Sequence, residues 1–181
     1  DQQQEYIQII KKSGDRMLNI INDIIDISKI ESGQMKVAYT ETHVNKSMEF
    51  LFRFFNPEAQ NKGIHLSYIK GLTDNESIIN TDQVKLNAIL TNIIKNAIKY
   101  TDNGQIEFGY DLKKKKKKNV FNPITLSHQD KLAELQFFIK DTGIGIPEDR
   151  IHAIFDRFVQ ADIGDKRAFQ GAGLGLSISK A

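Results

Sequence analysis

The sequence has no cysteine, no long apolar run and no large excess of charge of either sign. Without cysteine the chain has neither disulfides nor thiolate metal sites, which fits a reducing compartment. No stretch approaches the roughly 18–20 apolar residues that a membrane-spanning helix needs, and no signal peptide is visible. We therefore expect a cytoplasmic domain. Its polar, helix-like start indicates a piece of a longer protein, for which anchoring in the inner membrane stays open.

The net charge of the chain is only +2, and much of its positive charge is concentrated in one place. Lys113 to Lys118 form an uninterrupted run, and removing these six charges from +2 leaves −4. The basic pI of about 8.7 is therefore a local feature, and we expect no nucleic-acid partner. The run lies in a polar insert, residues 111–131, which we interpret as a solvated hairpin tip. The alternative is contact with an acidic partner or a membrane surface.

The first 32 residues are predicted to form one long helix, because apolar residues recur at intervals of three and four. Gly33 follows as a helix stop. The apolar positions are Ile7, Ile10, Met17, Leu18, Ile21, Ile24, Ile25, Ile27 and Ile30. Such a stripe needs a partner, either the rest of its own domain or a second helix in a dimeric bundle. Its length and strength favour the dimer.

The rest of the chain mixes helices and strands without regular alternation, which is typical of an α+β sandwich. Helices are predicted over residues 44–62, 83–100 and 148–158, and strands over residues 34–39, 64–69, 77–80, 105–110 and 132–140. Thr81 or Asp82 is expected to cap the helix that begins at Gln83. The core face predicted for the helix over 44–62 consists of Phe50, Leu51, Phe54 and Phe55. A glycine-rich stretch leads into a last helix near the C-terminus.

The predicted helix over residues 83–100 carries the first chemical signal. Its broad apolar arc comprises Leu86, Ile89, Leu90, Ile93, Ile94, Ala97 and Ile98. A narrow polar stripe along the edge of that arc consists of Lys85, Asn92, Asn96 and Lys99. Asparagine is not favoured inside a helix, whereas its amide oxygen suits Mg²⁺ and a nearby ammonium neutralises phosphate. The stripe is either a solvated edge or the face of a metal-bound polyphosphate site.

Two glycine-rich loops carry the second signal, DTGIGIP at residues 141–147 and QGAGLGLSIS at residues 170–179. Neither is a dinucleotide fingerprint or a P-loop, because Glu148 and Leu176 stand where glycine is required and no glycine–lysine–serine/threonine ending follows. A buried carboxylate, as Asp141 would be at a strand end, can accept a hydrogen bond from the exocyclic amine of a base. The second loop enters a helix, whose first N–H groups suit phosphate. Each loop alone is equally compatible with an ordinary turn.

Four segments, LTNIIKNAIKYT, DTGIGIP, FDRFVQ and GAGLGLSISK, resemble in sequence order the N, G1, F and G2 boxes of sensor histidine kinases of two-component systems. The leading EYIQIIKKSGDRMLNIINDIIDISKIESG resembles the second helix of that family's dimerisation and phosphotransfer domain. The resemblance implies that residues 1–33 are the C-terminal helix of that domain. It implies that residues 34–181 are an ATP-binding catalytic domain, shortened at its C-terminus. The implied fold is a two-layer α/β sandwich with a mixed sheet, related to gyrase and chaperone ATPases.

The resemblance also implies roles for individual residues. Asn96 matches the Mg²⁺-ligating asparagine, and Asn92 assists it. Lys99 matches the lysine that faces phosphate, and Tyr100 the aromatic residue beside the nucleotide. The residues implied at the base are Asp141, which reads adenine, with Gly143, Gly145 and Ile146. In the family a mobile loop, the lid, lies near the phosphates. Phe155 and Phe158 match the F box, which anchors the lid. The residues implied at the lid and the phosphates are Arg167, Gly171, Gly173, Leu174, Gly175 and Leu176.

The implied activity is transfer of the γ-phosphoryl group of ATP, with Mg²⁺, to a histidine. In the water-hydrolysing branches of the superfamily, a glutamate typically stands at the position of Asn92 and acts as general base. An amide cannot take a proton at neutral pH, which favours the kinase. Two alternatives stay open: a hydrolysing ATPase of the same fold, and a non-catalytic nucleotide-binding or dimerisation module.

The phosphoacceptor is expected upstream of Asp1. The histidines of the chain are His43, His65, His128 and His152, and none has the acidic neighbour and R-T-P context of the family's acceptor. No catalytic residue is therefore assigned within the chain, and the chain alone is not expected to phosphorylate itself. The expected partners are a second copy bound through the N-terminal helix, the upstream phosphoacceptor domain and a response regulator receiver domain.

Overall fold

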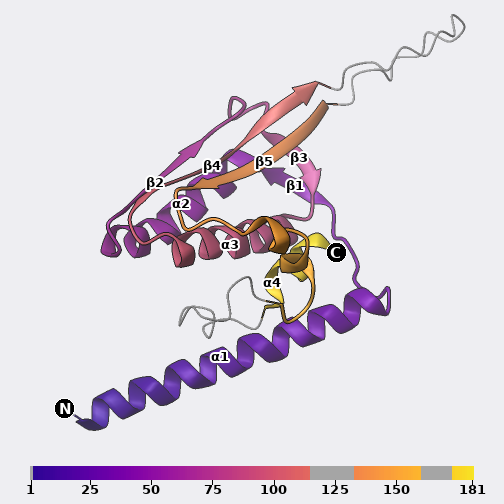
Figure 1. Cartoon of the computed structure of the whole chain (residues 1–181). Coiled ribbons are helices and arrows are strands. Elements are labelled where there is room, and N and C mark those ends of the chain that lie inside the picture. Colours follow the sequence, from indigo (N-terminus) through magenta and orange to yellow (C-terminus); the bar gives the residue numbers. More distant parts are fainter. Residues whose placement is uncertain (1, 115–132, 160–172) are drawn as a thin grey trace, which may run out of the picture. The chain divides into compact units, whose positions relative to one another are not determined.

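The computed structural model of the chain describes residues 2–114, 133–159 and 173–181 (Figure 1). The chain forms two compact units, one of residues 39–144 and the other of residues 1–38 together with 145–181. Beyond Lys114 the predicted lysine-rich insert lies outside the described residues.

The unit of residues 39–144 is an α/β sandwich. Its elements are β1 (Thr40–His43), α2 (Val44–Asn61), β2 (Ile64–Ile69), β3 (Ile78–Thr81), α3 (Gln83–Tyr100), β4 (Gly104–Lys114) and β5 (Ala133–Asp141). β1 pairs with β3 in antiparallel fashion, while β4 lies between β2, its parallel neighbour, and β5, its antiparallel neighbour. The three-stranded sheet is thus mixed, as predicted, and both helices cover one face of it (Figure 1).

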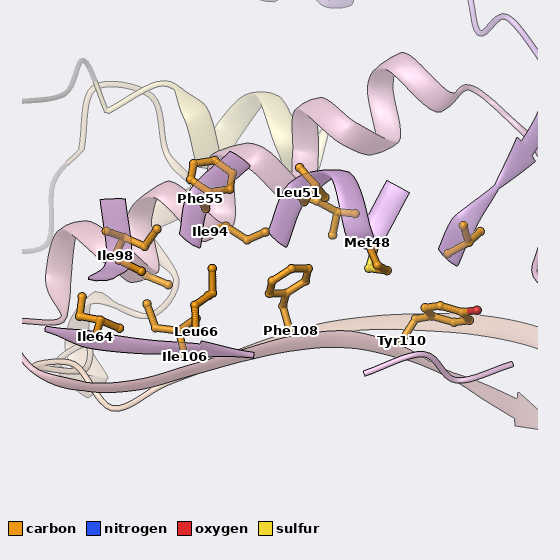
Figure 2. Close-up of a cluster of buried hydrophobic side chains, with 14 residues drawn as sticks. Met48, Leu51, Phe55, Ile64, Leu66, Ile94, Ile98, Ile106, Phe108 and Tyr110 are labelled. Atoms are coloured by element: carbon orange, nitrogen blue, oxygen red, sulfur yellow. The ribbon is translucent and has the colours of Figure 1, made fainter. Parts of the chain in front are cut away.

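The core of this unit lies between the two helices and the sheet (Figure 2). Alternate residues of β4 point inward, so that Ile106, Phe108 and Tyr110 are fully buried. The helices contribute Val44, Met48, Leu51, Phe55 and Ala59 from α2, and Leu90, Ile94, Ala97 and Ile98 from α3. Burial of each large side chain contributes about 1.5–3 kcal/mol. This core fixes α3 against the sheet and therefore fixes the polar side chains that α3 carries.

The apolar face of α2 differs from the predicted one. Leu51 and Phe55 are fully buried, as expected, but Phe50 and Phe54 are 58% and 61% exposed. The rings of Phe50 and Phe54 stack on each other with centroids 6.2 Å apart. The prediction was wrong for these two residues because the face of α2 that packs on the sheet is the one formed by Met48, Leu51 and Phe55. That face leaves Phe50 and Phe54 on the outer side.

A polar cluster, buried at Tyr110 and Asn45 and exposed at Asp74, joins α2 to β4 and to the loop between β2 and β3. The hydroxyl of Tyr110 donates to Asn45 Oδ1 at 2.6 Å, and Asn45 Nδ2 donates to Leu72 O and to Asp74 Oδ1. The amide of Asn45, followed by the nearby Lys70, holds the pKa of Asp74 below its usual value. Burial raises the pKa of Tyr110 above 10.0. The hydrogen bond between Tyr110 and Asn45 ties the start of α2 to β4.

The second unit contains α1 (Gln2–Glu31), two short 3₁₀ turns and α4 (Gly175–Lys180). Gly33 follows α1 with a φ of +65°, in agreement with its predicted role as a stop. None of the described side chains of α1 is buried. In the part of the chain that the structure describes, no helix is both long and apolar enough to cross a membrane.

Two predicted elements are corrected by the structure. Residues 34–39 form no strand; the strand is Thr40–His43, because its partner is the distant Ile78–Thr81. The helix predicted over residues 148–158 is replaced by the turns η1 (Glu148–Arg150) and η2 (Ala153–Phe155). At Phe158 the backbone has a φ of 62°, which is incompatible with a continuing helix.

Candidate functional site

The start of α3 is fixed by its cap. Asp82 accepts a hydrogen bond from the N–H of Lys85 at 3.0 Å, as an N-cap residue should. The ammonium of Lys85 reaches the other oxygen of Asp82 at 2.8 Å. Lys85 is thus engaged at the first turn, and the polar stripe of interest begins further along the helix.

The remaining stripe residues, Asn92, Asn96 and Lys99, lie on the helix at intervals of four and three. All three are half-buried, whereas Lys95 between them is exposed. Asn92 and Asn96 are thus one turn, about 6 Å, apart on the same face. The ammonium of Lys99 lies 4.8 Å from the ring centroid of Tyr100. Two amides and one cation on one half-buried face suit a charged, oxygen-rich ligand.

The C-terminal carbonyl groups of α3 have defined partners. The N–H of Thr101 donates to Ala97 O at 3.0 Å. The ammonium of Lys62, which follows α2, donates to Ile98 O at 2.7 Å. The N–H of Ile144 donates to Tyr100 O at 3.2 Å. The last turn of α3 is therefore held by α2 on one side and by the loop after β5 on the other.

Lys62 was not found from the sequence as a site residue. The Asn61–Lys62–Gly63 stretch indicated only the end of a helix. The side chain satisfies carbonyl groups that the end of α3 leaves without intrahelical donors. A cation there also complements the helix dipole. The only signal in the sequence was a lysine at a helix terminus, which does not identify the second helix.

Asp141 ends β5 opposite Ile106 in the antiparallel register. Its Oδ1 accepts a hydrogen bond from the N–H of Gly143 at 2.9 Å. The side chain is exposed rather than buried, so that part of the prediction was wrong. The carboxylate is nevertheless held at the strand end, and the adjacent Thr142 hydroxyl accepts from the N–H of Gln105 at 3.0 Å. This one hydrogen bond leaves other acceptor positions of the carboxylate available to a ligand.

Glycine is required at two positions of the loop after β5, for different physical reasons. A Cβ at Gly143 would lie 2.5 Å from Tyr100 O and 2.9 Å from both Asp141 Oδ1 and Thr101 Oγ1. Gly143 is therefore required by close approach of the loop to the end of α3. Gly145 has open space around it but a φ of +72°, so it is required by backbone conformation.

These residues fit the ATP and Mg²⁺ that the sequence resemblance implies. Within residues 39–144 the structure brings together the half-buried amides of α3, Tyr100, and the carboxylate loop with its Gly143 contact. Among the described residues, no group of three or more His, Asp or Glu side chains could hold a metal ion.

The other predicted site residues belong to the second unit or lie outside the described residues. Arg167 and Gly171 are outside them. Ile146 is exposed, and Leu174 is buried. Gly175 and Leu176 form the first turn of α4 and are half-buried. Their contact with a nucleotide remains a prediction.

The F-box residues lie next to Gly173 in this second unit. The N–H of Phe158 donates to Gly173 O at 3.1 Å. A Cβ at Gly173 would lie 3.0 Å from Val159 O, and the φ of this glycine is +70°. The ammonium of Lys180 lies 5.3 Å from the ring centroid of Phe155. Segments on either side of residues 160–172 are thus joined by a backbone hydrogen bond.

Solved structures share the α/β sandwich fold of this chain. The chain aligns with full-length ShkA in complex with AMPPNP at a TM-score of 0.72 and 24% identity, over 98% of this chain and 33% of that one. It aligns with ThkA in complex with the response regulator protein TrrA at a TM-score of 0.55 and 19% identity, over 86% and 40%. At these identities the likeness concerns the fold.

The family follows from the sequence itself. Residues 81–181 match the family described as histidine kinase-, DNA gyrase B- and HSP90-like ATPase, and the chain belongs to that family. Residues 1–33 match the His kinase A (phospho-acceptor) domain. The expected fold class is thereby confirmed.

Curated relatives confirm the resemblance to sensor histidine kinases. The chain is 33% identical over 178 residues to the autoinducer 2 sensor kinase/phosphatase LuxQ of Vibrio cholerae serotype O1, which covers 98% of this chain. It is 35% identical over 179 residues to hybrid signal transduction histidine kinase B of Dictyostelium discoideum, again over 98% of this chain. The chain spans only 19% and 8% of these two relatives.

Proposed function

We propose that this chain is the ATP-binding catalytic region of a two-component sensor histidine kinase. In the full-length protein it transfers the γ-phosphoryl group of ATP to a histidine. The bond from the γ-phosphorus to the oxygen that leaves with ADP breaks, and a bond to an imidazole nitrogen forms. The observation that carries this proposal is the joining of the α3 amide stripe to the Asp141 loop through the Ile144–Tyr100 hydrogen bond.

The accepting histidine lies outside this chain in our proposal. Residues 1–33, which match the phospho-acceptor domain, contain no histidine. His43 and His65 lie on β1 and β2, and His152 lies between the two 3₁₀ turns. None has the acidic neighbour and R-T-P context that the resemblance requires. The chain then supplies nucleotide binding and positioning, and another segment supplies the nucleophile.

The α3 stripe is assigned to the phosphate end of ATP. Asn96 and Asn92 offer amide oxygens for Mg²⁺, which when bound neutralises phosphate charge. Lys99 adds a positive charge three residues further along the helix. Asp141 is assigned to the exocyclic amine of adenine. An amide at position 92 provides no general base, so the arrangement favours transfer to a side chain over attack by water.

The proposed partners follow from α1 and from the relatives. Large apolar side chains of α1 are exposed, among them Ile10 at 71% and Met17 at 66%. An apolar stripe of this length suits a helix bundle formed with a second copy of the chain. The solved complex of ThkA with a response regulator supports a receiver domain as the downstream partner kind. Dimerisation and phosphorelay are therefore parts of the same proposal.

Isothermal titration calorimetry with ATP tests the site, with and without Mg²⁺. Asn96→Ala should weaken Mg²⁺–ATP binding about tenfold or more, while the melting temperature stays within about 2 °C, because the side chain serves a ligand. Lys95→Ala is the matched control, since this neighbour is exposed on the same helix. Absence of ATP binding by the unmodified chain under both conditions, or collapse of the Asn96→Ala fold, contradicts the assignment. Rapid phosphate release without an acceptor histidine would favour the hydrolysing ATPase.

A further inference from the structure

Thr101, the first residue after α3, has a buried hydroxyl group without a partner. The residue is fully buried, and among the described residues no hydrogen-bond partner is found for its Oγ1. A buried hydroxyl in this state is unfavourable relative to water, since it has lost solvent without gaining a partner. Such an atom in a folded protein calls for a physical explanation.

The position of this hydroxyl connects it to the carboxylate loop. An ideal Cβ at Gly143 would lie 2.9 Å from Thr101 Oγ1 and 2.9 Å from Asp141 Oδ1. The hydroxyl and the carboxylate therefore approach the same point, and only the hydrogen atoms of a glycine fill it. Gly143 permits this approach, and any other residue would separate the two groups.

The Asp141 carboxylate is able to supply the missing partner. It is exposed, and in the described structure its one protein donor is the N–H of Gly143, two residues away. An exposed carboxylate can rotate about its side-chain bonds at little energetic expense. The Thr101 hydroxyl, which has no access to solvent, cannot contact a ligand itself. It can act on a ligand only through a neighbouring protein group.

We propose that Thr101 is a positioning residue for base recognition, and that its hydroxyl donates to the Asp141 carboxylate when a nucleotide is bound. One carboxylate oxygen is then oriented by protein donors, and the other faces the exocyclic amine of the base. This inference rests on the proposed ATP site. It makes Thr101 responsible for the preference for a base that carries this amine. An oriented carboxylate oxygen forms a stronger hydrogen bond with a donor at a defined position, and a base without the amine lacks that donor.

The test uses the near-isosteric Thr101→Val and the conservative Thr101→Ser in the full 181-residue chain. Calorimetry measures the affinity for ATP and for purine riboside triphosphate, which lacks the exocyclic amine. Thr101→Val should weaken ATP binding about tenfold, by loss of one hydrogen bond to a charged group, and change the analogue much less. Thr101→Ser, which keeps the hydroxyl, should bind ATP as tightly as the unmodified chain. Thr40→Val, an exposed threonine on β1, is the matched control.

Stability of the ligand-free chain provides the second readout. Because the hydroxyl has no partner before binding, Thr101→Val should leave the melting temperature unchanged or raise it. A lower melting temperature with equal weakening of both triphosphates would show a structural role and overturn the inference. Unchanged ATP affinity and selectivity in Thr101→Val would overturn it while leaving the ATP site intact. If the unmodified chain binds neither triphosphate, the proposed function itself fails and the inference fails with it.

Discussion

Replacement of Gly143 by alanine tests the contact between the end of α3 and the carboxylate loop. The added Cβ would lie 2.5 Å from Tyr100 O, which is far inside normal van der Waals separation. The obstacle is a backbone oxygen at the end of a helix, so it cannot rotate away as a flexible side chain could. Either the loop or the helix end must move by several tenths of an ångström.

The expected loss of stability combines two terms. Overpacking of a well-packed site destabilises by about 1–3 kcal/mol. The movement also weakens the 3.2 Å hydrogen bond from Ile144 N–H to Tyr100 O, which contributes about 1 kcal/mol. The free energy of unfolding should therefore fall by roughly 2–4 kcal/mol, which lowers the melting temperature by about 10 °C for a domain of this size.

Differential scanning calorimetry measures the melting temperature of Gly143→Ala, and titration with ATP measures its binding. Gly145→Ala is the control, because open space surrounds Gly145 and only its positive φ is strained. That variant should lose about 1–2 kcal/mol through the left-handed backbone alone. If Gly143→Ala melts within about 2 °C of the unmodified chain and binds ATP equally well, the proposed tight contact does not exist.

Three further predictions concern the frame around the site. Phe55→Ala should cost about 3–5 kcal/mol in urea unfolding, whereas Phe50→Ala should cost under about 0.5 kcal/mol, since only the first ring is buried; equal losses would contradict the observed face of α2. Lys62→Met should destabilise by about 0.5–1 kcal/mol and weaken ATP binding in calorimetry, since the end of α3 loses a charged donor; unchanged binding would separate Lys62 from the site. The raised pKa of Tyr110 stabilises the fold fully below pH 10.0 and this contribution is lost as pH rises toward the folded pKa. In urea unfolding measured against pH, Tyr110→Phe should therefore lose less of its unfolding free energy above pH 10.0 than the unmodified chain. At neutral pH the same variant leaves Asn45 Oδ1 without its donor.

Local patterns in the sequence predicted the elements that depend on local physics. The α3 helix and β2 were predicted with the bounds that the structure shows, because a cap at Asp82 and a glycine at Gly63 mark their limits. β1 was misplaced, since a four-residue strand is defined by its partner, and that partner begins at Ile78. Hydrophobic spacing likewise could not decide which edge of the aromatic cluster on α2 faces the sheet.

The candidate site divides along the same line. Asn92, Asn96 and Asp141 were predicted as ATP-site residues from residue type, spacing and family resemblance. Thr101 and Lys62 were not predicted, because the contacts that single them out involve groups distant in sequence. A buried hydroxyl without a partner and a lysine that caps another helix leave no periodic signal. Such residues become visible only when the chain is folded.

The exposure of large apolar side chains along α1 has a thermodynamic consequence. A helix of 30 residues whose described side chains include none that is buried receives little stability from tertiary packing. If a second copy covers its apolar stripe, helix formation and association become one linked equilibrium. The helical content of this segment would then depend on protein concentration, whereas the melting of residues 39–144 would not. Dilution would thus unfold α1 while residues 39–144 stay folded.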